Sequence, residues 1–432
     1  MNHTMMAIAN SVSSIPWSLK RLSKDESRRM ICRCTKTGKE IRISAETTTD
    51  LPSSNPYKMA MKAARKAFTQ EVSFQNKEND MSLAKVLLYI AAENEAFNAL
   101  NKEMDACSVA SETSNIASLP AAPEWNCIEE MLMEGKTLHQ WLNELDKMGQ
   151  EVKSELGNRD VGCNLVDVVG AVNTVLFKRR GFTRAPFVTD SKQWYLHSVL
   201  STGRASGKPF SKTASRITFL RFTAAVLLSV IYMEVCARIG VQIIGSRVGE
   251  EFLIWPQTGN PEILFSESSG RSLFATVNGR CVGDPKSPAS DLTSSSLNDL
   301  EIATKRDVIG IALAGLLRVH WKRASRSNHG LMLISPLRHL ATPSLRSQDL
   351  RLAIMAAERL LLLQPHNWAL RRDHGMMRYY ARDYVAAVQE LSICMAFAPE
   401  EEVQILEAFV QRLHLLRLES SWMSPLDHLP VS

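Results

Sequence analysis

Apolar residues recur every three to four positions over most of this chain, which is the spacing of amphipathic helices. The pattern predicts helices over residues 57–105, 125–156, 166–181, 194–200 and 227–240, with a polar linker at 108–123. Three runs rich in β-branched and aromatic residues, at 241–247, 250–256 and 272–285, predict strands. Helices followed by a run of strands indicate an α+β fold, here predominantly α.

The C-terminal part of the chain fits a helical repeat. Pro365 and Pro399 lie one tetratricopeptide repeat apart, about 34 residues, and residues 367–399 fit its helix–turn–helix pattern. Gly375 and Ala387 take the small positions at which the two helices of a repeat cross, and Ala353 takes the matching position of a preceding helix. Three residues depart from the commoner types of the pattern, namely His374, Arg378 and Cys394. Repeats of this kind bind other proteins and carry no chemistry of their own.

The first helix of such a repeat lines a concave face that receives partners. In this register the face carries Arg372, Met376, Tyr379 and Tyr380. Arg and Tyr are frequent anchors of protein interfaces, so these four residues are the predicted partner-binding set. The alternative is that they cap or solvate the helix.

Composition excludes several classes of function. The apolar content of 45%, the charged content of 22% and the net charge of +6 are ordinary for a globular protein, and they give no sign of nucleic-acid binding. The longest uncharged apolar run, 222–233, is too short to span a membrane. The eight cysteines have no zinc spacing, and the loop at 203–208 lacks the spacing of a phosphate loop. We therefore expect neither a cofactor nor a metal.

Residues 1–46 have the composition of an organelle transit peptide. No acidic residue occurs in 1–24, which contains five serines, and arginines follow at 28, 29 and 33. The abundance of serine favours the chloroplast, with the mitochondrion as the alternative, and the segment is expected to be disordered. A basic tail without a targeting role is the other interpretation.

Two stretches are basic and lack acidic residues. Residues 308–348 predict a helix to about Lys322 and then a loop, and the scarcity of aromatic residues favours a solvated loop over a nucleic-acid contact. Residues 207–224 are expected to form a surface loop, or to come from a retained intron in the gene model.

Several motifs occur in an order that resembles the SirB-type family, in which a transglutaminase-like domain precedes tetratricopeptide repeats. They are NTVLFKRRGF at 173–182, the segment 190–200, LLSVIYMEVCARIGV at 227–241, then GEEFLIW, VGDP and TKRDV. The resemblance covers about residues 125–420 and places the inserted segment 207–224 inside it. The apolar spacing gives a helical segment at 47–157, and the resemblance implies a transglutaminase-like domain at 158–300 and a helical-repeat domain at 301–432.

Active enzymes of the resembled type use a Cys at the start of a buried helix and a His and an Asp on the following strands. The thiolate attacks, the imidazole activates it and the carboxylate orients the ring. Here the helix start is Ala225-Val226-Leu227, the His position is Glu251, and only Asp284 matches. Cys236 lies farther along the helix and is expected to be a buried thiol. The domain is therefore predicted to be degenerate, a pseudo-enzyme without a catalytic site.

Together these patterns predict a non-catalytic scaffold or assembly factor of the plastid that holds a protein or peptide partner. One alternative is a residual hydrolase or amide-modifying enzyme that uses Asp284. The other is an organellar RNA-associated protein that uses residues 308–348.

Overall fold

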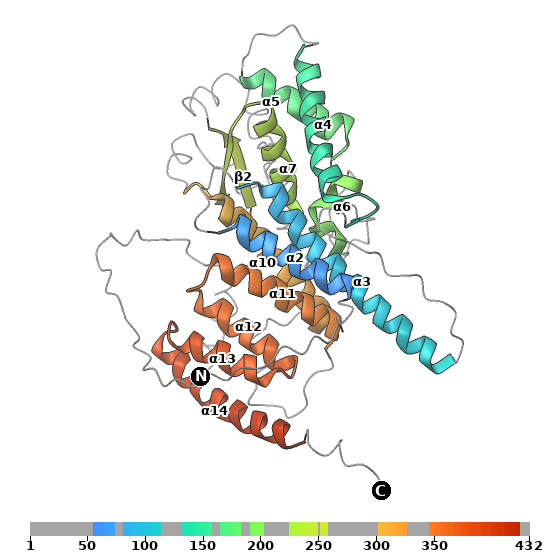
Figure 1. Cartoon of the computed structure of the whole chain (residues 1–432). Helices are drawn as coiled ribbons and strands as arrows, with labels where there is room; N and C mark the ends of the chain where they lie inside the picture. Colours follow the sequence, from blue (N-terminus) through green and yellow to red (C-terminus); the bar gives the residue numbers. More distant parts are fainter. Residues whose placement is uncertain are drawn as a thin grey trace, which may run out of the picture. The chain divides into compact units, whose positions relative to one another are not determined.

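A computed structural model describes residues 55–73, 81–113, 131–157, 165–182, 191–202, 224–248, 251–257, 301–325 and 345–423. These residues form a predominantly α-helical α+β structure with one small sheet, which confirms the predicted fold class (Figure 1).

Three helices make up the described part of the N-terminal segment: α2 (Pro56–Glu71), α3 (Leu83–Thr113) and α4 (Leu138–Gly157). The predicted helix at 57–105 is thus two helices, and α3 continues into the predicted linker. The predicted helix at 125–156 is wrong over 131–137, because Glu134 and Gly135 have positive φ angles of 49° and 80°. They form a turn, closed by backbone hydrogen bonds between Met133 and Lys136, that no helix can contain.

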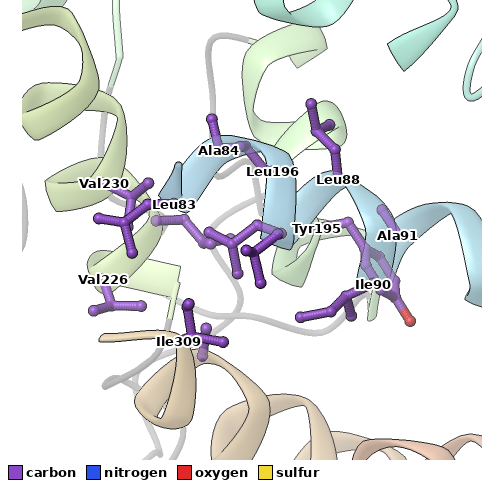
Figure 2. Close-up of a cluster of buried hydrophobic side chains, with 14 of the residues drawn as sticks. Leu83, Ala84, Leu88, Ile90, Ala91, Tyr195, Leu196, Val226, Val230 and Ile309 are labelled. Carbon is purple, nitrogen blue, oxygen red and sulfur yellow. The ribbon is translucent and has the colours of Figure 1, made fainter. Parts of the chain in front are cut away.

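Helix α3 is apolar on most sides over its first turns, where Lys85 is exposed, and a largely apolar helix of that kind is buried. It packs against α6 (Leu196–Thr202), α7 (Ala224–Arg238) and α10 (Lys305–Ser325). Figure 2 shows Leu83, Leu88 and Ile90 pointing from α3 toward these neighbours. The centre of the structure is therefore a helix from the N-terminal segment.

The motif at 173–182 forms an irregular helix end. Helix α5 (Leu165–Asn173) continues as a π-helix, η3 (Thr174–Arg179), and the chain leaves it at Gly181, whose φ is 69°. The predicted stop at Gly181 is confirmed, whereas the π-turn was not predicted. Arg179 and Arg180 form ion pairs with Glu155 and Glu151 of α4. A short 3-10 helix, η4 (Ser191–Trp194), precedes α6.

An antiparallel hairpin follows α7. Its strands are β1 (Ile243–Val248) and β2 (Glu251–Pro256), and the register runs from Ile243 opposite Pro256 to Val248 opposite Glu251. Two of the three predicted strands are confirmed, and the third, at 272–285, lies outside the described residues. Gly240 ends the helical turn before β1 with a φ of 86°, as predicted.

The described residues of the C-terminal part form five helices in sequence: α10, α11 (Ser347–Leu363), α12 (Trp368–Tyr380), α13 (Tyr384–Met395) and α14 (Glu400–Met423). Each packs on the next, as the orange to red helices of Figure 1 show. Asn367 and Asp383 cap α12 and α13 by accepting hydrogen bonds from Leu370 N and Ala386 N. These bounds match the helix–turn–helix predicted at 367–399.

The main hydrophobic core draws on α2, α3, α4, α7, α10 and α11, so the helical segment, the α+β region and the C-terminal helices share it. A second, smaller core lies between α12, α13 and α14. Among the described residues, no helix combines the length and the apolarity needed to cross a membrane.

Candidate functional site: the transglutaminase-like region and the C-terminal helices

Helix α7 begins where the resemblance places the nucleophile. It starts at Ala224, and the following Val226 and Leu227 are fully buried. Aliphatic side chains here can neither attack a carbonyl nor donate a proton. The start of α7 therefore supplies packing and no nucleophile.

The other positions of the predicted triad do not supply a thiol–imidazole pair. Glu251 is the first residue of β2, opposite Val248. Cys236 is buried in the last turns of α7, and burial raises the pKa of its thiol far above the ordinary value, so the reactive thiolate is not formed near neutral pH. Asp284 lies outside the described residues. In the described ranges, no three His, Cys, Asp or Glu side chains are grouped to hold a metal ion.

The structure places two of the four predicted partner-binding residues in the interior. Arg372 and Met376 are each 2% exposed, because α14 covers this face of α12. Arg372 lies 3.5 Å from a carboxylate oxygen of Glu402 on α14 and over the ring of Trp368. The expectation that Arg372 is a surface residue is therefore wrong. A partner reaches Arg372 or Met376 only if α14 moves.

The two tyrosines of the set are partly buried and join helices together. Tyr379 packs edge-on against Phe409 of α14, with ring centroids 5.3 Å apart. Tyr380 packs against Trp321 of α10 at 5.9 Å. Both tyrosines keep part of their surface open to solvent.

The predicted crossing of the repeat is close, but it pairs different residues. A Cβ added to Gly375 would lie 2.7 Å from both Cγ and Cδ2 of Leu391, so the nearest neighbour of Gly375 is Leu391 and not Ala387. Ala387 is fully buried one turn earlier on α13. The small residue at 375 is thus required by the leucine that packs on it.

Buried charged and polar side chains connect α12 and α13. His374 is buried and its Nδ1 lies 3.6 Å from a carboxylate oxygen of Glu390 on α13. Asp373 is buried beside Arg372, and burial raises the pKa of its carboxyl to about 6, against the opposing effect of the arginine. A buried carboxyl with a raised pKa makes stability depend on pH.

We expect the structure to lose stability as the pH rises from about 4 to about 6, through the folded pKa of Asp373. The sign follows because the folded state holds this proton more tightly than the unfolded chain, whose Asp titrates near 3.8. Asp373→Asn should remove this loss of stability between pH 4 and pH 6. It should therefore raise the free energy of unfolding at pH 7 by about 1–3 kcal/mol. Urea unfolding at pH 4 and pH 7 measures it, with the exposed Asp105→Asn as control. An unchanged pH dependence in Asp373→Asn would contradict the expectation.

A buried polar network joins α3 to the C-terminal helices and was not predicted. Arg359 of α11, 1% exposed, forms an ion pair with Glu93 of α3, with Nε 3.0 Å from Oε2. Its Nη1 donates to Oδ1 of Asn94 at 3.4 Å. Asn94 Nδ2 in turn donates to the hydroxyl of Tyr195 at 2.9 Å. One chain of polar contacts thus links three separate stretches of sequence.

The network continues to a histidine and an aspartate. The Tyr195 hydroxyl lies 3.0 Å from His320 Nε2, and His320 Nδ1 lies 4.0 Å from Asp349 Oδ1. Burial lowers the pKa of His320 and raises that of Tyr195, so both groups are neutral near pH 7. The phenol then donates to Nε2, and the imidazole carries its proton on Nδ1, facing Asp349.

The order Asp349, His320, Tyr195 is like a relay, yet each of these side chains is buried in the described structure. Buried side chains of this kind orient the helices that carry them. Only polar residues inside apolar runs, such as Glu93-Asn94 in LLYIAAENEAF and Arg359 in IMAAERLLLL, offered a sequence signal for it.

Comparison with known families gives one result. The Transglut_core2 model, described as the transglutaminase-like superfamily, matches residues 221–314. That range contains α7, β1, β2 and the first half of α10. Neither the curated proteins nor the solved structures give a match. The chain therefore contains a transglutaminase-like domain at residues 221–314.

Proposed function

We propose that this protein is a non-catalytic interaction scaffold or assembly factor. Its transglutaminase-like domain serves as a structural support, and the helices of the 301–432 region bind a protein or peptide partner. The proposal includes membership of the SirB-type family and identifies the C-terminal helices as tetratricopeptide-like repeats.

The observation that carries the proposal is the start of α7. The helix begins with Ala224-Ala225-Val226-Leu227, so the position that needs a thiol has none. The single cysteine of this helix, Cys236, is buried with a raised pKa and is unsuited to replace it. Loss of the nucleophile supports a structural role for the domain.

The C-terminal helices support the binding role. They form successive packed pairs, and such stacked pairs present extended surfaces to partners. The partly open Tyr379 and Tyr380 are the accessible members of the predicted set, since Arg372 and Met376 lie under α14. We place the protein in the plastid, on the composition of residues 1–46, with the mitochondrion as the alternative.

Affinity capture from a plastid extract tests the proposal. The tagged chain should retain a defined protein, and nuclease treatment should leave that capture unchanged. Gly375→Ala, which forces α12 from α13, should reduce capture about tenfold or more, whereas Gly157→Ala, at the end of α4 with open space around it, should not.

The nuclease treatment and the Gly375→Ala variant distinguish the proposal from its alternatives. Capture that disappears with nuclease would favour RNA association through residues 308–348. Capture that is indifferent to Gly375→Ala, in a variant shown by circular dichroism to have loosened this region, would place the partner surface elsewhere and contradict the proposal.

A further inference from the structure

Helix α14 covers a face of α12 and α13 through a narrow contact. In Figure 1 it is the last helix of the C-terminal part, beside α13. Its buried apolar side chains lie on one stripe: Leu406, Phe409, Val410 and Leu413. By contrast, nine apolar side chains of the shorter α11 are buried. Within the described residues α14 belongs to the smaller core alone, so it can open without disturbing the main core.

The rest of this contact is charged. Arg372 of α12 is buried, and its Nη1 lies 3.5 Å from Oε2 of Glu402 in the first turn of α14. The carboxylate of Asp373 is buried beside the same guanidinium, 3.4 Å from Nη2. The desolvation of such charges offsets much of their mutual attraction, so the pair adds little net stability to the contact. Helix α14 is therefore held mainly by its short apolar stripe.

The face that α14 covers is the one on which the repeat pattern predicts partner binding. Three of the four predicted residues contact α14, namely Arg372, Met376 and Tyr379. That prediction used the repeat alone and took no account of α14. Arg, Met and aromatic residues are enriched at protein interfaces. The repeat pattern and the residue types of the covered face thus indicate the same binding surface.

Helix α14 itself shows what kind of molecule fits this face. It presents an apolar stripe two turns long, which begins at Leu406, and the carboxylate of Glu402 lies one turn before that stripe. An amphipathic helix is a common ligand of apolar faces of this kind, and it is recognised by apolar side chains three, four and seven residues apart. Arg372 supplies the positive charge that selects an acidic residue at the start of such a helix.

We propose that α14 is a displaceable cover, and that the face of α12 and α13 beneath it binds an amphipathic helix of a partner protein with an acidic residue one turn before its apolar stripe. This inference rests on the proposed function, because it names the surface and the partner chemistry of that same binding role. The resident α14 competes with the partner as a covalently linked ligand, and so at a high effective concentration.

A labelled peptide of residues 399–418 is the probe, and fluorescence anisotropy with the full chain measures its binding. The wild type should bind it weakly, because the resident helix covers the site. Phe409→Glu in the chain releases that helix and should strengthen binding about tenfold or more. Leu413→Ala, a milder change, should also strengthen it and keeps the test decisive if Phe409→Glu prevents folding. The matched control is Ile405→Glu, on the outer side of α14 and 57% exposed, which should bind like the wild type.

Two altered probes test the acidic residue. Glu402→Gln in the peptide should weaken its binding to the Phe409→Glu chain about fivefold or more, because Arg372 then lacks its charged partner. Glu401→Gln changes the neighbouring, exposed residue and should have no effect. Equal affinity of the unaltered probe for the wild type, Phe409→Glu and Leu413→Ala overturns the proposal, and so does binding that is indifferent to Glu402→Gln.

Capture from the plastid extract distinguishes this inference from the proposed function. Excess probe should displace the partner from the Phe409→Glu chain. A captured partner that the probe leaves in place overturns the inference while the proposed function stands, whereas no captured partner contradicts the proposed function and the inference with it. A wild-type dimer in sedimentation equilibrium that Phe409→Glu abolishes would assign the covered face to α14 of a second copy, and would also overturn the proposal.

Discussion

Replacing Arg359 by methionine is expected to lower the free energy of unfolding by about 3–5 kcal/mol, because the change leaves the carboxylate of Glu93 buried without its partner. Both side chains of this ion pair are almost fully buried, so water cannot replace the lost contacts. Asn94 also loses the donor to its amide oxygen. Urea unfolding monitored by circular dichroism measures the change.

A second variant separates loss of a charge partner from loss of packing. Glu93→Leu combined with Arg359→Met replaces the ion pair by apolar side chains of similar size and should recover most of the lost stability. Arg65→Met is the control, since Arg65 is nearly half exposed in its pair with Glu358 and such pairs contribute at most about 1 kcal/mol. Equal losses in Arg359→Met and Arg65→Met would contradict the assigned role of the buried pair.

Gly375→Ala is expected to cost about 1–3 kcal/mol through overpacking of the crossing between α12 and α13. Alanine is the better helix former by about 1 kcal/mol, which acts in the opposite direction. The clash prevails because the new Cβ would lie 2.7 Å from Cγ and Cδ2 of the fully buried Leu391 and only 3.5 Å from its backbone nitrogen. Thermal unfolding and limited proteolysis of the C-terminal helices report the loss.

The matched control is Gly157→Ala, whose added Cβ has no atom of the described residues within 4 Å and which should be neutral or slightly stabilising. In a Leu391→Ala background the clash is absent, so adding Gly375→Ala should cost little. If Gly375→Ala destabilised that background as much as the wild type, the contact with Leu391 would not be the cause.

The sequence predicted most helices because their apolar residues keep a helical period and because Gly181 and Gly240 end them with positive φ angles. It misplaced the start of α4, since the turn at Glu134 and Gly135 interrupts a stretch that still has helical spacing. The predicted domain boundaries also place α3 and α10 in different domains, although the two helices pack against each other. Periodicity reports which face of a helix is buried and not which element covers it.

The same limit explains why two of the four predicted partner-binding residues are buried. The repeat register located α12 correctly and still made Arg372 a surface residue, because nothing in residues 367–399 shows that α14 folds back over it. The buried polar network was not predicted from the sequence for a related reason. Glu93, His320 and Arg359 lie in three helices that are far apart in the sequence, and only the fold brings them together.

The absence of a thiol at the start of α7 could be read from the sequence alone, since it depends on residue type at one place in a motif. The structure adds that this place is a packed interior, with Val226 and Leu227 fully buried. It adds also that burial keeps Cys236 protonated.

The central claim, that the transglutaminase-like domain performs no chemistry, is tested most directly by assaying the purified chain for amide hydrolysis and transfer with glutamine-containing peptides and an amine acceptor. The account predicts no turnover above that of buffer, and the same result for Asp284→Ala. Turnover by the wild-type chain that Asp284→Ala abolishes would contradict it.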